Sequence, residues 1–337
     1  MPIKNAISKV IEGASLTKDE MVAVMEQIMT GAASDAQIGS FLTALRIKGE
    51  TIDEITGAVI VMREKALSVD AGEGPVVDTC GTGGDGVNTF NISTTSAFVT
   101  AGAGLTVAKH GNRAVSSASG SADVLKALGV NISAEVKTVE KCLSDIGIGF
   151  LFAPLMHGAM KYAIGPRREI GARTIFNILG PLTNPAGAKA QVIGVYDRSL
   201  LEPLAEVLKN LGAKRVMVVH GSDGLDEITV TGVTYAATSV EGKTETFKID
   251  PEKLGMPLRG LDEIKGGDPS ANAKITRSVL DGEKGARRDV VLLNAAAAIW
   301  AGGAANSLEE GIEKAKESID SGSAKEKLEL LVTKTCQ

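Results

Sequence analysis

The chain has 337 residues and a formal net charge of −5, from 36 Lys and Arg against 41 Asp and Glu. This length can bury one large core or a large and a small one, and we expect two domains. The acidic balance supplies no overall cationic field for nucleic acid or an anionic membrane. Cys80, Cys142 and Cys336 lie far apart without CxxC spacing, which argues against a disulfide framework and a zinc site. We therefore expect a cytoplasmic protein that binds neither nucleic acid nor membrane.

Three helix starts are predicted in residues 1–70, each a capping residue followed three positions later by Glu or Gln: Thr17 and Glu20, Ser34 and Gln37, Thr51 and Glu54. Gly31 and Gly49 stand where helices should end. Apolar residues recur at helical spacing between these signals: Met21, Val24, Met25, Ile28, Ile38, Phe41, Leu42 and Leu45. Residues 1–70 are thus predicted to form a small α-helical domain whose apolar residues make a bundle core, with a dimer surface as the alternative.

The pattern changes after Leu67. Short β-like runs at 105–108, 191–196 and 216–219 alternate with helical stretches at 121–128, 200–211 and 289–301. This alternation predicts a larger wound α/β domain over residues 71–337. Residues 165–190 interrupt it with Pro and Gly and show little strand character, so we expect them to join the helical domain.

A glycine-rich segment, residues 78–86 (DTCGTGGDG), follows a predicted strand at Val76 and Val77, and residues 91–95 (NISTT) open the next helix. Glycines let backbone N–H groups turn inward, and a helix N-terminus favours an anion. Phosphate is the expected ligand. The segment matches neither the GxxxxGK[ST] nor the GxGxxG motif, so a mere tight turn remains an alternative. So does a routine N-cap role for Asn91 or Ser93.

A second candidate is the KHGNR segment, residues 109–113, which also follows a predicted strand. Two cations, a His and a Gly at the carboxyl edge of a strand suit a polyanion, whereas a solvated basic loop is the alternative. Residues 119–123 (SGSAD) supply hydroxyl groups at the next helix start. We expect a second phosphate-sized concavity there.

These segments, with GSADVLKALG at 120–129, resemble the motifs GTGGD, NxST, KHGNR and GSADVLxALG of anthranilate phosphoribosyltransferases, in the same order. The resemblance continues through RREIGARTIFNILGPLTNP at 167–185 and through VHG at 219–221 with GLDE at 224–227. It covers nearly the whole chain. It implies a small α-helical domain plus a larger wound α/β domain of the nucleoside phosphorylase/phosphoribosyltransferase type. It also implies a substrate cleft between them and a homodimer formed through the helical domain.

The resemblance implies transfer of the phosphoribosyl group of phosphoribosyl pyrophosphate (PRPP) to the amine of anthranilate. The products are N-(5-phosphoribosyl)anthranilate and pyrophosphate, in tryptophan biosynthesis. The implied cofactor is Mg²⁺, two ions per subunit, one held by Ser93 and one by Asp226 and Glu227. Adjacent carboxylates are often only exposed charge, but in a loop after a strand they are hard oxygen ligands that suit Mg²⁺. An anthranilate synthase subunit is a further implied partner.

By motif position, the resemblance assigns PRPP to the glycine-rich segment, the helix start and the KHGNR segment. The implied residues are Gly81, Gly84, Asp85, Thr89, Asn91, Ile92, Ser93, Thr94, Lys109, His110, Gly111, Asn112, Arg113, Ala114, Val115, Ser116, Ser117 and Ser121. It assigns anthranilate to Gly81, Asn112, His157, Arg167 and Gly180, with Arg167 facing the substrate carboxylate.

Lys109 and Arg167 are the residues expected to act in catalysis. Displacement of pyrophosphate builds negative charge on the leaving group, which Mg²⁺ and Lys109 would neutralise. The aniline nitrogen is already neutral at pH 7 and needs only orientation. We therefore expect no essential Ser, Cys or His nucleophile and no covalent intermediate.

One departure concerns the acceptor pocket. The family often has two neighbouring His where this chain has Met156 and His157, and His157 could also be a satisfied loop histidine. A pyrimidine nucleoside phosphorylase, similar in fold, is the rival enzyme, but those enzymes lack the GPLTNP stretch at 180–185 and the Asp-Glu pair. A catalytically silent relative that binds nucleic acid is the other rival, and the acidic balance weighs against it.

Overall fold

The computed structural model describes residues 1–114 and 118–337. The chain begins with four helices: α1 (Ile3–Ile11), α2 (Lys18–Met29), α3 (Asp35–Lys48) and α4 (Ile52–Lys65). The three predicted capping boxes open α2, α3 and α4, and Gly31 and Gly49 follow the ends of α2 and α3 with positive φ. The sequence analysis missed α1, which begins after Pro2 without a side-chain cap.

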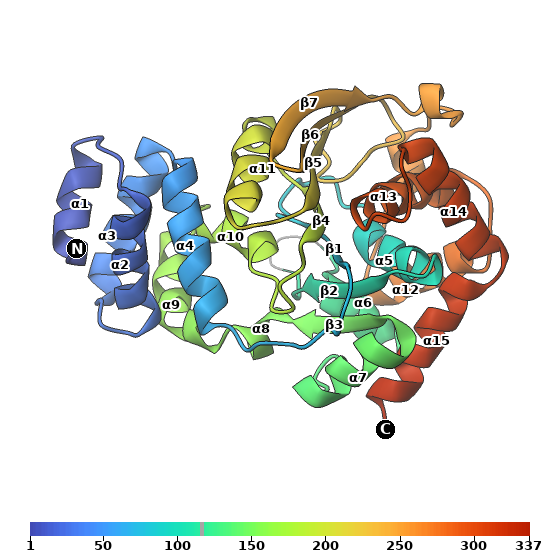
Figure 1. The fold of residues 1–337 in the computed structure, drawn as a ribbon, viewed down its shortest axis with the longest axis horizontal. Helices are drawn as coiled ribbons and strands as arrows, with labels where there is room; N and C mark the ends of the chain where they lie inside the picture. The colour runs from blue at the N-terminus through green and yellow to red at the C-terminus, as the bar shows by residue number, and fades with distance from the viewer. Residues whose placement is uncertain (115–117) are drawn as a thin grey trace.

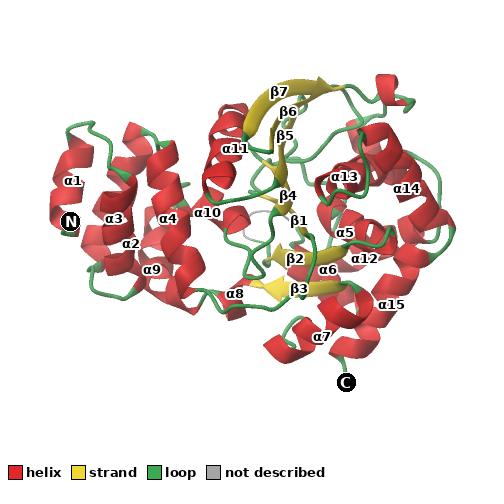
Figure 2. Ribbon diagram, in the orientation of Figure 1, coloured by secondary structure: helices red, strands yellow, loops and turns green. Residues whose placement is uncertain are grey.

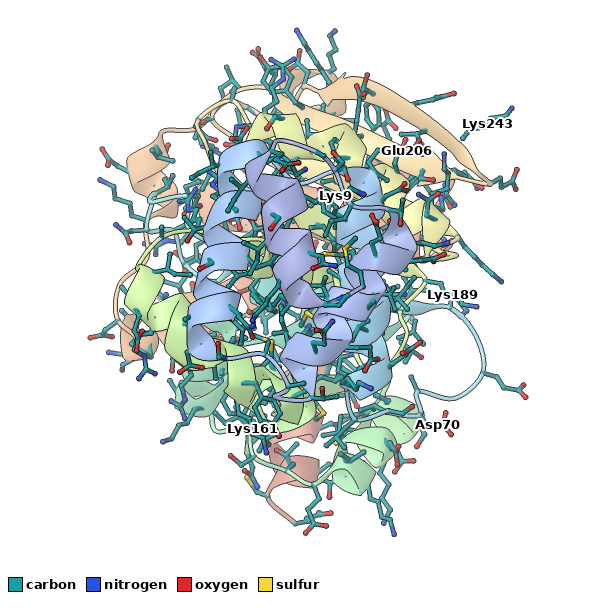
Figure 3. The ribbon with its side chains drawn as sticks, turned by 90° about the vertical axis from the view of Figure 1, so that its left-hand side faces the viewer. Lys9, Asp70, Lys161, Lys189, Glu206 and Lys243 are labelled. Carbon is teal, nitrogen blue, oxygen red and sulfur yellow. The ribbon has the colours of Figure 1, made fainter. Side chains whose placement is uncertain are left out.

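The N-terminal helices share a core. The eight apolar residues predicted at helical spacing are each at most 1% exposed, so they form a bundle core as expected. Two later helices, α9 (Lys161–Ile170) and α10 (Phe176–Leu182), add to this group: α9 packs on α2 and α3, and α10 packs on α4. In the view onto these helices, Lys161 of α9 lies below them and Glu206 of α11 (Leu201–Asn210) lies above them (Figure 3).

A seven-stranded sheet forms the centre of the rest of the chain (Figure 1). Its strands are β1 (Val76–Gly81), β2 (Thr106–Gly111), β3 (Ile148–Phe152), β4 (Ala190–Gly194), β5 (Arg215–Gly221), β6 (Thr234–Val240) and β7 (Lys243–Ile249). The spatial order is β3-β2-β1-β4-β5-β6-β7. The first five strands run parallel to one another. β6 pairs antiparallel with β5, and β7 pairs antiparallel with β6. A small helical part and a larger wound α/β part are thus confirmed.

Helices cover both faces of the sheet (Figure 2). The remaining ones are α5 (Ile92–Gly102), α6 (Ser121–Leu128), α7 (Val136–Ile146), α8 (Ala153–Met156), α12 (Pro269–Leu280), α13 (Ala286–Ala301), α14 (Leu308–Asp320) and α15 (Ser323–Thr335). The largest core lies between the sheet and α5 and α13. On the opposite face α11 packs against β5 and β6, and its core continues without a break into the N-terminal helices. No helix in the described ranges has the length and apolar character needed to cross a membrane.

The strand order creates a switch point between β1 and β4. From β1 the chain moves outward to β2 and β3, then returns to place β4 on the other side of β1. Loops at the carboxyl ends of such neighbouring strands diverge, and ligands bind in the crevice between them. Four strands end on glycine there: Gly81, Gly111, Gly194 and Gly221.

Two predicted loops begin later than the sequence suggested. β1 continues through Gly81, so the first four residues of the glycine-rich segment are strand. Lys109 and His110 belong to β2 and are 3% and 5% exposed, so the solvated-loop alternative is wrong for both of them. Asn112 and Arg113 are exposed, beyond the strand end.

Glu54 offers a test of how the N-terminal helices are held. Its side chain is fully buried and accepts hydrogen bonds from the N–H groups of Leu16 (2.9 Å) and Thr51 (2.8 Å) and from Lys48 Nζ (2.9 Å). Glu54→Ala leaves the N–H groups of Leu16 and Thr51 unpaired and removes the carboxylate that pairs with Lys48, whose Nζ keeps its bonds to Gly49 and Ser15. We therefore expect it to lower the free energy of unfolding by about 3–5 kcal/mol. Glu20→Ala, at the matching position of the exposed box on α2, is the control and should shift the urea midpoint far less. Equal shifts would contradict the assignment.

Candidate active site

The loop after β5 folds directly over the ends of β1 and β4. A Cβ at Gly81 would lie 2.2 Å from Asp226 Oδ2, and a Cβ at Gly194 would lie 1.4 Å from the Asp226 carbonyl oxygen. The backbone contact leaves room only for glycine at position 194, whereas a side chain at position 81 would displace the Asp226 carboxylate. The close approach holds Asp226 and Glu227 at the switch point.

Asp226 contacts the glycine-rich segment, and Glu227 contacts the start of α5. Asp226 Oδ2 accepts a hydrogen bond from Gly83 N (2.7 Å), and Glu227 Oε1 accepts one from Ser93 N (3.1 Å). Asp85 also contacts Asp226. Burial, and then repulsion from Asp85, raises the pKa of Asp226, while burial and then Asp226 raise the pKa of Glu227 to about 8. The three acidic groups thus lie close enough for their repulsion to raise the pKa of Asp226 and that of Glu227.

The donor chemistry of these residues suits a hard divalent cation. Carboxylate oxygens are the protein ligands that Mg²⁺ prefers, and Mg²⁺ usually takes one or two of them together with water and substrate phosphate oxygens. In the described ranges no three His, Cys, Asp or Glu side chains are arranged as a ready metal cage. The site therefore fits an ion that shares its coordination with a phosphate-bearing ligand.

The start of α5 is not a routine cap. Asn91 is the N-cap residue, but its side chain makes no capping bond; it donates to the Ser119 carbonyl (3.1 Å) and accepts from Asn272 Nδ2 (3.0 Å). Ser93 lies inside the helix, so the N-cap alternative is wrong for Ser93, while Asn91 takes the N-cap position without a side-chain capping bond. The buried hydroxyl of Thr94 has no hydrogen-bond partner among the described residues, an uncommon state that a bound ligand would relieve.

Lys109 lies within the sheet below this helix start. Its Nζ donates to the carbonyl oxygens of Thr79 and His110. Its charge acts to lower the pKa of both Asp78 and Glu227, against the larger effect of their burial. Lys109 is thus a fixed positive charge beside the acidic groups.

The rest of the KHGNR segment wraps around the start of α6. A Cβ at Gly111 would lie 2.2 Å from Ser121 Oγ, and the Asn112 carbonyl accepts from Ser121 Oγ (3.3 Å). Asp123 accepts from the Ala114 N–H (2.9 Å) and pairs with Arg113 (3.2 Å). Three residues assigned to PRPP, Val115, Ser116 and Ser117, lie outside the described residues.

Two histidines meet on the other side of β2. His110 Nε2 lies 3.2 Å from His157 Nε2, and the His110 ring also bonds the backbone of Gly180. Burial lowers the pKa of His110 to about 3 and that of His157 to about 4, so both rings are neutral at pH 7. His157 is therefore not an isolated loop histidine. The structure thus brings together three residues that the motifs assigned to the site: His110, His157 and Gly180.

Other assigned residues stand apart. Arg167 is half-buried, lies 5.1 Å from the Phe176 ring centroid, and makes no hydrogen bond to Gly81, Asn112 or His157 in the part of the chain that is described. Thr89 forms an isolated β-bridge with Lys265. The Ile92 side chain belongs to the core, so only its backbone can reach a ligand.

The departure at Met156 also becomes clear. Met156 is 1% exposed and packs with Val69 and Leu151 in a small separate core. The side chain that replaces the family's histidine is therefore a core residue. We therefore expect the replacement at position 156 to influence the acceptor pocket only through the backbone of the neighbouring His157.

The sequence analysis missed the residues that support the site. Asp78 is fully buried and accepts from His110 N (3.1 Å) and Asn184 Nδ2 (2.8 Å). Arg173 donates to the Gly84 carbonyl and lies over the Tyr196 ring. All three residues lie inside segments quoted in the sequence analysis, but no role was predicted for them. The one available signal was Asp78, an acidic residue directly after the apolar pair Val76 and Val77.

Known proteins resemble this chain along its whole length. Residues 4–66 match the helical bundle domain of a glycosyl transferase family, and residues 73–325 match the a/b domain of that family. Fold and site thus define a two-domain glycosyl transferase. The anthranilate phosphoribosyltransferase of Geotalea uraniireducens (strain Rf4) is 56% identical over 347 residues, with 99% of each chain covered.

Solved structures agree. The Thermus thermophilus anthranilate phosphoribosyltransferase matches with a TM-score of 0.94 at 42% identity, covering 98% of this chain and 99% of that one. The Saccharomyces cerevisiae enzyme in complex with PRPP and Mg matches with a TM-score of 0.90 at 29% identity, covering 99% and 98%. This chain belongs to the anthranilate phosphoribosyltransferase family, which confirms the resemblance of the motifs. It is an enzyme of tryptophan biosynthesis that transfers a phosphoribosyl group to anthranilate.

Glu227 should make the stability of the metal-free protein depend on pH. Its folded pKa of about 8 lies above the ordinary 4.5, so the folded chain holds this proton more tightly than the unfolded chain does. Stability should therefore fall as pH rises between these two values. With EDTA present, we expect the thermal midpoint to fall more from about pH 5 to about pH 8 in the wild type than in Glu227→Gln, which cannot ionise. Identical pH dependence in both proteins would refute this origin.

Proposed function

We propose that the phosphoribosyl transfer takes place at the switch point, where the carboxyl ends of β1 and β4 meet the start of α5. The observation that best supports this proposal is the position of two carboxylates beside the buried Lys109. Asp226 accepts a hydrogen bond from the N–H group of Gly83, and Glu227 accepts one from that of Ser93. A helix start that already binds a carboxylate is suited to a phosphate oxygen. The neighbouring carboxylates give the same place affinity for a cation.

In this proposal PRPP occupies the residues that the motifs assigned to it, from the glycine-rich segment to the start of α6. Gly81, Gly84 and Asp85 contact the pyrophosphate from one side, and Ser93 and Thr94 of α5 contact it from the other. Lys109, Ser121 and residues assigned between them, including Val115, Ser116 and Ser117 outside the described ranges, complete the site in this proposal. The unpartnered hydroxyl of Thr94 supports this placement.

We further propose two Mg²⁺ ions per subunit, one held by Ser93 and one by Asp226 and Glu227. The presence of Mg with PRPP in the yeast relative supports the metal, and the raised pKa values of the two carboxylates support its place. Mg²⁺, when bound, neutralises charge on the leaving pyrophosphate. A bound cation would lower the cost of ionising the two carboxylates and offset their repulsion of the PRPP phosphates, which favours joint binding of metal and PRPP.

Arg167, Asn112, His157 and Gly180 form the acceptor side in this proposal, with Gly81 at its border. The Arg167 guanidinium pairs with the anthranilate carboxylate, an arrangement that planar, bidentate recognition favours. The aniline nitrogen attacks the anomeric carbon with its lone pair as the bond to pyrophosphate breaks. Neutral rings at His110 and His157 add no positive charge near the ribose as its own positive charge develops.

The remaining assignments are also proposals. We propose that residues 1–70 and about 165–190 form one domain and that residues 71–337 otherwise form the other. Packing of α9 and α10 on the N-terminal helices supports this division. A homodimer through the helical domain, contact with an anthranilate synthase subunit and a cytoplasmic location complete the proposal. The three free cysteines support the location.

The reaction itself gives the direct test. Purified protein mixed with PRPP, MgCl₂ and anthranilate should consume anthranilate, measured as loss of its fluorescence, and EDTA should stop the loss. No consumption in spite of demonstrated PRPP binding would exclude anthranilate as the acceptor. Phosphorolysis of thymidine by the same preparation would instead support a pyrimidine nucleoside phosphorylase.

Lys109→Ala tests the electrostatic role of the buried cation. Because a fixed charge beside the leaving group acts mainly in the transition state, we expect kcat to fall by about a hundredfold, the scale typical of one lost stabilising group. Steady-state kinetics in the folded variant measure this. Unchanged kcat would remove Lys109 from catalysis, and a change in the anthranilate KM alone would place it on the acceptor side.

A further inference from the structure

Arg173 joins the loop between α9 and α10 to the glycine-rich segment. Its guanidinium donates a hydrogen bond from Nη2 to the Gly84 carbonyl oxygen. Gly84 has a φ of +77°, and a Cβ there would lie only 3.1 Å from Arg173 Nη2. The absence of a side chain at Gly84 thus makes room for the guanidinium.

The guanidinium is held from a second side by Tyr196, two residues beyond the end of β4. Arg173 lies 4.1 Å from the Tyr196 ring centroid, and Tyr196 N donates to Thr82 Oγ1 (3.1 Å). Stacking of guanidinium on an aromatic face restricts its orientation. Arg173, Tyr196 and Thr82 therefore connect three chain segments across the switch point.

The glycine-rich segment is consequently held by opposite charges at adjacent residues. Gly83 donates its N–H to Asp226 (2.7 Å), and Gly84 offers its carbonyl to Arg173. Gly83 uses only Oδ2 of Asp226, so a cation bound as proposed above would share that carboxylate with the Gly83 N–H. The contact with Arg173 does not compete with the cation.

The other end of the same loop bears on the acceptor side. Arg167 lies against the Phe176 ring, 5.1 Å from its centroid, so residues 167–176 close on themselves. Arg173 stands within this closed stretch. Arg173 therefore lies in the same short stretch as Arg167, between the proposed acceptor side and Gly84.

We propose that Arg173 is a positioning residue that couples the two substrate subsites, so that occupation of the pyrophosphate site tightens the binding of anthranilate. This inference rests on the proposed function, because it takes Arg167 and the glycine-rich segment as the acceptor and donor sides. By linkage, anthranilate must tighten pyrophosphate binding by the same factor.

Anthranilate fluorescence gives its dissociation constant with and without pyrophosphate and MgCl₂, conditions under which no turnover occurs. We expect at least about fivefold tightening in the wild type, the lower range of coupling between sites, and none in Arg173→Ala. Arg168→Ala is the matched control, since Arg168 is exposed on α9 and makes no hydrogen bond or ion pair within the described chain. It should keep the wild-type tightening.

Tyr196 separates coupling from folding. Tyr196→Phe keeps the stacked ring and should keep the tightening, whereas Tyr196→Leu removes the ring and should reduce it. A lowered thermal midpoint with undiminished tightening in Arg173→Ala, or a wild type without tightening, would overturn the proposal. Wild-type turnover of PRPP and anthranilate tests the function independently, so failure of the coupling and failure of the function are told apart.

Discussion

The structure depends on the close contact of one loop with two strand ends. The backbone and carboxylate of Asp226 occupy the space that side chains at Gly194 and Gly81 would fill. This contact fixes Glu227 against Ser93 N and Asp226 against Gly83 N, and so joins the loop after β5 to the start of α5. Because all three segments diverge from neighbouring parallel strands, the sheet order itself brings them together.

Charged and neutral groups of the candidate site lie on opposite sides of β2. Lys109 and the crowded acidic groups face α5, whereas the paired His110 and His157 are neutral on the opposite side of β2. Asp78 links the two sides, since its carboxylate holds the His110 N–H and the Asn184 amide. Burial is the main cause of every one of these pKa shifts, which is the mark of a site that excludes water.

The sequence predicts most strongly where local chemistry decides the structure. Capping boxes at Thr17, Ser34 and Thr51 act within a few residues, so α2, α3 and α4 were predictable, whereas α1 has no side-chain cap. The β6–β7 hairpin was missed because β7 is largely exposed and lacks a clear apolar alternation. In the site, motifs led to Ser93 and Glu227, but the contact between them joins residues far apart in the chain and needed the fold.

The same distinction explains why Arg173 carried no local signal. Its partners, Gly84 and Tyr196, come from two different strand ends, and its exposed position resembles that of Arg168, which has no partner in the described chain. A transfer without a protein nucleophile, which is what we expect here, depends on placement of two substrates rather than on one reactive side chain. Placement must be shared between the helices that carry Arg167 and the sheet that carries Lys109. In the arrangement proposed here, residues that bridge the two parts, such as Arg173, help to set how well the reacting atoms are aligned.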